Sequence, residues 1–197
     1  MGSYYYFVSQ LPYLVYGQQP PLSSAAFREQ CLNFLDPADK AQLDRCSFDI
    51  PPELPSPLKP MPGEAAELSS AFIKNWREWE RVLRLNLVRF RSQRLKREGA
   101  AEAPEYPADA AQAAKSASSM DSPLEAEITL DRARWDAIER FRAGNDFGPD
   151  YVFAYLLKLI LMERRSSFKP EEGFMEYKTL YASIMENAGS AESGVPK

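Results

Sequence analysis

Apolar residues recur at intervals of three and four along most of the chain, which is the spacing of amphipathic helices. The longest pattern runs from Ala65 to about Glu98. Its apolar side follows a 4,3,4,3,4 spacing through Phe72, Trp76, Trp79, Leu83, Asn86 and Phe90. This spacing predicts one long helix with a coiled-coil-like aromatic seam and a basic stripe nearly opposite to it. We interpret Trp76 and Trp79 as core residues and Asn86 as a polar position that sets the register of a helix pair.

Capping signals predict shorter helices before the long one. A serine cap at Ser23 or Ser24 begins one helix, and the pair Asp36-Pro37 begins the next. The aromatic and apolar segment 4–16 fits either a short buried helix or a strand, because so short a run has no decisive period.

The C-terminal part of the chain predicts three further helices. Pro123 opens a helical region, and we expect Asp131 to cap a helix that ends before Gly144. The run Pro149–Ser167 is apolar almost all round and therefore predicts the most buried helix. The last predicted helix, about Glu171–Asn187, has four apolar residues on one face: Phe174, Tyr177, Tyr181 and Ile184.

Segments without this periodicity divide the chain. Residues 51–62 hold six prolines and predict an extended crossing, and residues 99–121 are rich in Ala, Ser and Pro and predict a flexible loop. The sequence therefore predicts an all-α protein, a helical bundle with a long amphipathic helical hairpin and a flexible tip. Residues 1–62 form an aromatic segment with short helices and the proline-rich crossing, and residues 63–98 form a long basic helix. Residues 99–121 are a flexible loop. Residues 122–187 form C-terminal helices around a buried core helix, and residues 188–197 are a disordered tail.

Charge is distributed unevenly along the chain. The net charge is −4, yet residues 71–98 hold nine Lys or Arg against three Glu. The question of a partner therefore centres on the basic stripe of the long helix: Arg77, Arg81, Arg84 and Arg91. Three interpretations stay open, namely a solvated face partly paired with acidic groups of the same chain, a surface for an acidic protein, and a site for RNA or DNA. We expect no nucleic acid, because the acidic remainder of the chain repels phosphates.

Residue types that commonly carry catalysis or bind metals are scarce. The chain has no histidine, and its two cysteines, Cys31 and Cys46, lack the CxxC spacing and favour a reducing compartment. No phosphate-binding glycine loop and no hydrolase or metalloprotease motif occurs. Asp146, Asp150 and Glu163 are candidates for a paired acid–base site, but we interpret them as structural residues. We therefore predict no catalytic site, no cofactor and no metal.

The N-terminal segment has neither a basic start nor an uninterrupted apolar run, so no signal peptide is predicted. The most apolar stretch, Tyr151–Met162, is shorter than the ~20 residues that a membrane-spanning helix needs. We expect a cytoplasmic protein that does not insert into the membrane and associates with it only through a complex.

Two stretches resemble a known group of proteins. The opening segment Tyr4–Leu14, YYYFVSQLPYL, and the late stretch from Asp150 to Arg164, which begins DYVFAYLLKL, resemble an uncharacterised bacterial family encoded beside V-type ATPase genes. The late stretch is also similar to the central-stalk component of these ATPases that is designated C, or d in the eukaryotic enzyme. This resemblance implies an all-helical mechanical coupler that seats the central stalk on the membrane rotor ring. It implies V-type ATPase central-stalk and rotor subunits as partners and no catalytic residue.

Together with the absence of catalytic motifs, this resemblance implies a non-catalytic coupling or assembly subunit of a V-type ATPase rather than an enzyme. The expected partner contacts are the basic stripe and three tyrosines, which add contact area at low entropic cost: Tyr4, Tyr5 and Tyr6. One alternative is a helical adaptor or coiled-coil protein unrelated to ion transport, which would bury Trp76 and Trp79 against its partner. Nucleic-acid binding through the basic helix is the less favoured alternative.

Overall fold

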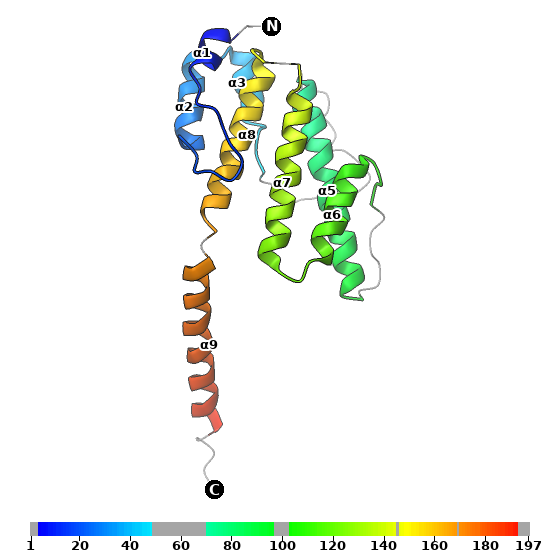
Figure 1. The fold of residues 1–197 in the computed structure, drawn as a ribbon, viewed down its shortest axis with the longest axis vertical. Coiled ribbons are helices and arrows are strands. Elements are labelled where there is room, and N and C mark those ends of the chain that lie inside the picture. The colour runs from blue at the N-terminus through cyan, green and yellow to red at the C-terminus, as the bar shows by residue number, and fades with distance from the viewer. Residues whose placement is uncertain (1–3, 49–69, 97–102, 145, 169, 193–197) are drawn as a thin grey trace. The chain divides into compact units, whose positions relative to one another are not determined.

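The structure is a computed structural model that describes residues 4–48, 70–96, 103–144, 146–168 and 170–192 (Figure 1). The chain divides into two compact units, Met1–Glu163 and Arg164–Lys197. Every regular element in the described ranges is a helix, which confirms the all-α prediction. The helices are α1 Tyr5–Ser9, α2 Ser24–Phe34, α3 Pro37–Leu43, α5 Ala71–Arg94, α6 Ala108–Ser119, α7 Pro123–Arg142, α8 Pro149–Ser166 and α9 Pro170–Glu192.

Helix α5 begins at a serine cap and buries the predicted aromatic seam. The Ser70 hydroxyl accepts a hydrogen bond from the Ile73 amide at 3.1 Å, which satisfies one of the free donors of the first turn. Trp76 and Trp79 are each 1% exposed, and their stacked rings lie 5.8 Å apart. The prediction that both are core residues is confirmed.

Helix α6 corrects the prediction of a flexible loop over residues 99–121. Residues Ala108–Ser119 are helical, and this helix packs against both α5 and α7 (Figure 1). Its inner face is made of buried alanines: Ala110, Ala114 and Ala117. Alanine loses no side-chain entropy on burial and lets two helix backbones approach closely. The large apolar groups that cover this face belong to neighbouring helices, so the composition of the segment alone did not reveal it.

Asn86 is buried in the seam of α5, as its position predicts. Its side-chain amide donates to the carbonyl of Val82 at 3.0 Å and to that of Pro104 at 2.8 Å. The residue therefore holds the segment that leads into α6.

Helix α7 is continuous and corrects the prediction that a helix starts at Asp131. The cap is Ser122, whose hydroxyl accepts from the Glu125 amide at 3.3 Å. Asp131 lies in the middle of the helix, is 1% exposed and forms an ion pair with Arg134 one turn away at 3.0 Å. Its carboxylate is therefore a core group rather than a cap.

Helix α8 is the core helix of the first unit, as predicted, and is buried continuously from Val152 to Leu159. Tyr155 donates a hydrogen bond to the carbonyl of Pro12 at 2.9 Å, which ties α8 to the opening segment. Lys158 is the charged residue in this apolar run. Its ammonium group pairs with Glu139 and lies 4.8 Å from the centre of the Trp135 ring.

The opening segment forms the short helix α1 followed by turns, which settles the choice between helix and strand. The predicted cap of α2 is confirmed, because the Ser23 hydroxyl accepts from the Ala26 amide at 3.1 Å. Its predicted inner face is buried: Phe27, Cys31 and Leu35.

Four predicted features lie wholly or partly outside the described residues. They are the proline-rich crossing 51–62, both ends of the predicted long helix (65–69 and 97–98), the start of the predicted loop (99–102) and the end of the predicted tail (193–197). Helix α9 runs on to Glu192, which corrects the predicted helix end at Asn187 and makes residues 188–192 helical rather than part of the tail. None of the described helices is long and apolar enough to cross a membrane.

Candidate functional site

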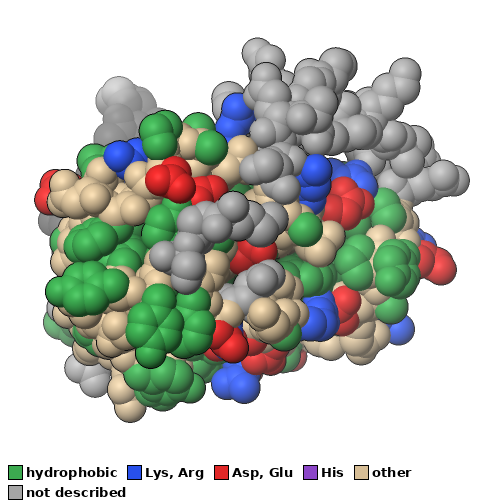
Figure 2. All heavy atoms as spheres, turned by 90° about the horizontal axis from the view of Figure 1, so that it is seen from above, with side chains coloured by type: hydrophobic (Ala, Val, Ile, Leu, Met, Phe, Trp, Pro, Cys, Tyr) green, Lys and Arg blue, Asp and Glu red, His purple; other side chains and the backbone are tan. Residues whose placement is uncertain are grey.

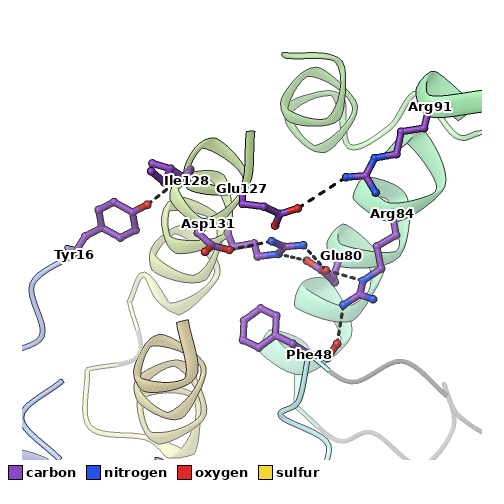
Figure 3. Close-up of polar contacts among 9 residues, drawn as sticks. Tyr16, Phe48, Glu80, Arg84, Arg91, Glu127, Ile128 and Asp131 are labelled. Carbon is purple, nitrogen blue, oxygen red and sulfur yellow. Dashed lines mark hydrogen bonds and ion pairs between the residues drawn. The ribbon is translucent and has the colours of Figure 1, made fainter. Parts of the chain in front are cut away.

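Three of the four arginines of the basic stripe pair with carboxylates of the same chain, and Figure 3 draws the pairs of Arg84 and Arg91. Arg81 pairs with Glu78 at 2.6 Å, and Arg91 reaches Glu127 on α7 at 3.9 Å. Arg77 is half-buried, and Arg84 belongs to the buried network described next. Pairing within the chain, one of the three interpretations of this stripe, is thus observed for Arg81, Arg84 and Arg91. A partner role for the stripe stays a prediction.

A network of buried charges joins α5 to α7 (Figure 3). Arg134 of α7 donates to both carboxylate oxygens of Glu80 at 3.1 Å, and it donates to Asp131 at 3.0 Å. Arg84 donates to Glu80 at 2.7 Å and to the carbonyl of Phe48 at 2.7 Å. Glu80, Asp131 and Arg134 are 7%, 1% and 4% exposed. Three segments distant in sequence are therefore held by one set of charge-assisted hydrogen bonds.

The network is matched in charge, which explains how it tolerates burial. Burial by itself lowers the pKa of Arg134, but the neighbouring charge of Glu80 and its hydrogen bonds outweigh this, and the net shift is upward. Removing one partner from such a set leaves an uncompensated buried charge, which costs about 3–5 kcal/mol. The arrangement therefore fixes how α5 and α7 pack, and it has the features of a structural element rather than of a reaction centre.

Asp109, at the start of α6, connects three helices. Its Oδ2 atom accepts from the indole Nε1 of buried Trp79 on α5 at 2.7 Å and from Arg140 on α7 at 2.7 Å. Partial burial by itself raises the pKa of Asp109, but the hydrogen bonds from Arg140 and Trp79 prevail and lower it. The aspartate is therefore held ionised as part of the packing of these helices.

The first of the three predicted contact tyrosines is not at the surface. Tyr4 is 7% exposed; its hydroxyl donates to Asp39 at 2.5 Å and accepts from the Asp36 amide at 3.2 Å. Burial raises the pKa of Tyr4 to about 12. Tyr4 therefore anchors the opening segment to the start of α3 and corrects the prediction that it contacts a partner.

The other two tyrosines belong to an exposed aromatic surface on the first unit, which we call the N-terminal aromatic surface. Figure 2 shows hydrophobic side chains gathered at the end of the molecule that carries α1 and α2. We group under this name the exposed aromatic residues of α1, α2 and the turns beside α1 and α8: Tyr5, Tyr6, Tyr13, Phe34 and Phe147, which are 62%, 69%, 87%, 42% and 44% exposed. The rings of Tyr5 and Phe147 lie 4.6 Å apart, so α1 and the turn before α8 contribute to one surface. Phe147 was not singled out from the sequence, because only the fold brings it beside Tyr5.

The three candidate acid–base carboxylates make structural contacts. Asp146 pairs with Arg142 at 2.7 Å, and Asp150 accepts from the cap hydroxyl of α5 at 2.7 Å. Glu163 accepts from the amide and hydroxyl of Ser24 at 2.7 and 2.5 Å, at the first residue of α2. These contacts agree with the interpretation of all three as structural residues.

The two thiols are buried and not joined to each other. Burial raises the pKa of Cys31 to about 12 and raises that of Cys46 as well, so neither is a thiolate at neutral pH. Within the described ranges, no group of three or more His, Cys, Asp or Glu side chains is arranged to hold a metal ion.

The second unit presents a different surface. Helix α9 carries an apolar face, called here the α9 face, whose side chains are 54–64% exposed: Phe174, Tyr177, Leu180, Tyr181, Ile184 and Met185. Tyr177 and Tyr181 stack on each other at 6.1 Å along the helix, which orders the rings in a row. The sequence predicted this face, but not that it would remain exposed.

The buried network was missed by sequence reasoning, although one signal was present. Glu80 lies four residues after Trp76 and three before Leu83, so helical geometry places a carboxylate beside the aromatic seam. A charge at such a position requires a buried partner.

Comparisons with protein-family models, with curated proteins and with solved structures gave no match for this chain.

Proposed function

We propose that this chain is a non-catalytic coupling or assembly subunit of a V-type ATPase, which helps to join the central stalk to the membrane rotor ring. The observation that carries the proposal is the exposure of Tyr5, Tyr6 and Tyr13. All three belong to the segment through which the sequence resembles the family encoded beside V-type ATPase genes. Grouped aromatic rings in water favour a protein contact, because burying them releases ordered water at little side-chain entropy cost.

The packing of the two resembling stretches supports the same proposal. The Tyr155 hydroxyl donates to the carbonyl of Pro12 across a separation of 143 residues. The Tyr4 amide donates to the carbonyl of Phe147, just before α8, at 2.9 Å. The two likenesses therefore belong to one structural region, as expected if they reflect a shared fold rather than two unrelated similarities of composition.

A mechanical role is also compatible with the internal charges of the first unit. A coupling subunit transmits force through a rigid body, and the Glu80–Arg134 pair resists sliding of α5 against α7 because any shift would strand buried charges. The basic stripe contributes less free charge than the sequence suggests. We therefore place the main partner contact on the N-terminal aromatic surface, with exposed Arg91 as a further contact to test.

The test is affinity purification of the tagged protein from its own cells, with mass spectrometry of the co-purified proteins. We expect central-stalk and rotor subunits of a V-type ATPase in a fixed ratio. With the double variant Tyr5→Ser/Tyr6→Ser, the amount of these subunits that co-purifies should fall at least tenfold. The matched control is Tyr106→Ser, because Tyr106 is 83% exposed but lies before α6, and this variant should retain them.

Failure to recover any ATPase subunit with the unaltered protein, under conditions that preserve the ATPase complex, contradicts the proposal. Recovery of one unrelated protein, lost on changing Tyr5 and Tyr6, would favour the helical adaptor instead. Enrichment of RNA that is abolished by Arg81→Glu would favour nucleic-acid binding.

A further inference from the structure

The two halves of helix α5 differ in how firmly their arginines are held within the chain. In the first half, Arg84 is 29% exposed and holds its carboxylate partner at 2.7 Å. In the second half, Arg91 lies 3.9 Å from Glu127 on α7 (Figure 3). Arg94 lies 3.5 Å from Asp121, and both of these arginine side chains are 60% exposed. Exposed pairs of this kind contribute little to stability, so both arginines can exchange these carboxylates for others.

Two exposed apolar side chains lie among these arginines. Val88 and Leu95 are 53% and 62% exposed. They are seven residues apart, which is about two helical turns, so they share one side of α5. The Leu95 amide donates to the Arg91 carbonyl at 3.0 Å, which keeps Leu95 in the helical register. Val88 lies two residues after the buried Asn86, so this side is nearly opposite to the seam. We call five residues the outer α5 face: Val88, Arg89, Arg91, Arg94 and Leu95.

The charge of this end of α5 determines which kind of segment fits the outer α5 face. Residues 88–96 contain four Lys or Arg and no Asp or Glu. The two carboxylates that pair with it, Glu127 and Asp121, reduce this local charge from +4 to +2. A helix with glutamate or aspartate beside an apolar stripe would cover Val88 and Leu95 and would gain attraction from the arginines on both sides of them.

Other occupants fit the outer α5 face less well. The phosphate backbone of RNA or DNA would pair with the arginines but would gain nothing from Val88 and Leu95, and the chain as a whole carries a charge of −4. A broad anionic lipid surface would also meet the carboxylate of Asp121, which is fully exposed beside Arg94. A second copy of the same face would set arginine against arginine. A single helix contacts a narrower strip, along which every charged residue of this end of α5 is cationic.

We infer that the outer α5 face docks an amphipathic helix of a partner protein, whose apolar stripe is flanked by glutamate or aspartate. The apolar residues of the partner cover Val88 and Leu95, and its carboxylates pair with Arg91 and with the arginines on either side. The inference does not rest on the proposed ATPase function, whose main contact is the N-terminal aromatic surface.

The experiment uses the full chain and two fluorescent synthetic peptides about three heptads long, with leucine at the a and d positions. One peptide carries glutamate at the e and g positions and the other carries lysine there, so like charges keep each peptide from pairing with itself. Fluorescence anisotropy on titration with the protein should show that the glutamate peptide binds about tenfold more tightly. General attraction to a chain of net charge −4 would favour the lysine peptide, so the expected order reports a local basic surface.

Two pairs of matched variants locate the contact. Arg91→Glu should weaken binding of the glutamate peptide about tenfold, whereas Arg132→Glu should leave it unchanged. Arg132 is 58% exposed and pairs with a carboxylate, as Arg91 does, but it lies on α7 outside the outer α5 face. Leu95→Ser should weaken binding severalfold. Leu32→Ser changes a leucine of 58% exposure on α2 and should not weaken it.

Four results would overturn the inference. One is a lysine peptide that binds as tightly as the glutamate peptide, or binding of neither. A second is an equal loss of binding in Arg91→Glu and Arg132→Glu, which would mean that only the total charge matters. A third is binding of a single-stranded RNA or of phosphatidylserine vesicles that is tighter than that of the glutamate peptide and is lost in Arg91→Glu. The fourth is a large loss of thermal stability in Leu95→Ser but not in Leu32→Ser without any peptide, which would mean that the chain covers this face itself.

Discussion

Helices α5 and α9 show similar patterns in sequence and different outcomes in structure. Both carry aromatic residues at intervals of three and four, with a strong charge of one sign on the rest of the helix. In α5 the seam is buried, with Trp76 and Trp79 each 1% exposed, and much of the basic stripe is paired within the chain. In α9 the equivalent residues, such as Tyr177 and Tyr181, are 61% and 54% exposed. An amphipathic pattern therefore reports that a face needs covering, but not whether the same chain covers it.

The largest difference should appear when one aromatic residue is removed from each helix. Trp76→Ala deletes a fully buried indole and should lower the free energy of unfolding by about 3–5 kcal/mol, because it loses apolar burial and leaves a cavity. Urea unfolding followed by circular dichroism measures the loss. Trp76→Phe keeps part of the apolar area and should cost clearly less. A Trp76→Ala protein as stable as the unaltered chain would show that the α5 seam is not the core.

The buried charge network should be the next largest contribution. Arg134→Met removes the cation shared by Glu80 and Asp131, leaves the half-buried Arg84 as the remaining counterion of Glu80, and should cost about 3 kcal/mol. The double variant Glu80→Met/Arg134→Met should recover part of this loss, because it also removes a buried carboxylate that has lost one of its two cations. Arg81→Met is the control, since its ion pair is half-exposed and is worth at most about 1 kcal/mol. Equal effects of Arg134→Met and Arg81→Met in urea unfolding would contradict a structural role for the network.

A smaller effect is expected in the pH dependence of the free energy of unfolding. The pKa of Asp109 is lowered in the folded protein, so its ionised form stabilises the fold above the unfolded value of about 3.9. This stabilisation is lost as the pH falls through the lower folded value. Asp109→Asn should therefore cost at most about 1 kcal/mol at neutral pH, because the carboxylate is nearly half exposed and solvent screens its pair with Arg140.

Tryptophan fluorescence during urea unfolding, measured at neutral and acidic pH, checks the Asp109 prediction because Trp79 is its partner. The Asp109→Asn protein should lose less stability between the two pH values than the unaltered protein. Asp121→Asn is the control, since it removes the same charge at a carboxylate that is fully exposed opposite Arg94. An Asp109→Asn protein with the full pH dependence would assign that dependence to other carboxylates.

The smallest effect is expected on the α9 face. Tyr181→Ala should change the free energy of unfolding of the isolated protein by less than about 0.5 kcal/mol, because the side chain is more than half exposed. A loss of stability comparable to that of Trp76→Ala would remove the distinction between the two helices.

Several elements followed directly from the residues. The cap of α2, predicted at Ser23 or Ser24, and the apolar run of α8 were found from local spacing and capping chemistry, because these signals act within one or two turns. Helix α6 was missed because alanine gives no apolar pattern strong enough to indicate burial. Asp131 was interpreted as a cap because aspartate favours caps. Its ion pair with the buried Arg134, which forms where α5 and α7 pack, helps to offset the cost of burying it.

The candidate surfaces divide in the same way. Tyr5 and Tyr6 are exposed as predicted, whereas Tyr4 of the same run is buried through its contacts with α3. From the sequence, the arginines of α5 could pair either within the chain or with another protein. In the fold, Glu127 on α7 lies close enough to pair with Arg91. Pairing across distant segments has no signature in local spacing, so it could not be inferred from one sequence.

Helix positions and faces depend on interactions between residues three or four apart, and these interactions can be inferred directly from the amino-acid sequence. Burial of a face and pairing of a charge with its counterion depend on contacts between distant segments. Tyr155 and Pro12, which are hydrogen-bonded, are 143 residues apart. Such contacts contribute favourable free energy only once the chain has closed the intervening loops and excluded water from the contact. Most of the helices could therefore be predicted from the residues, with α6 as the exception. The burial of the α5 seam, by contrast, was decided by the packing of α5 against its neighbours.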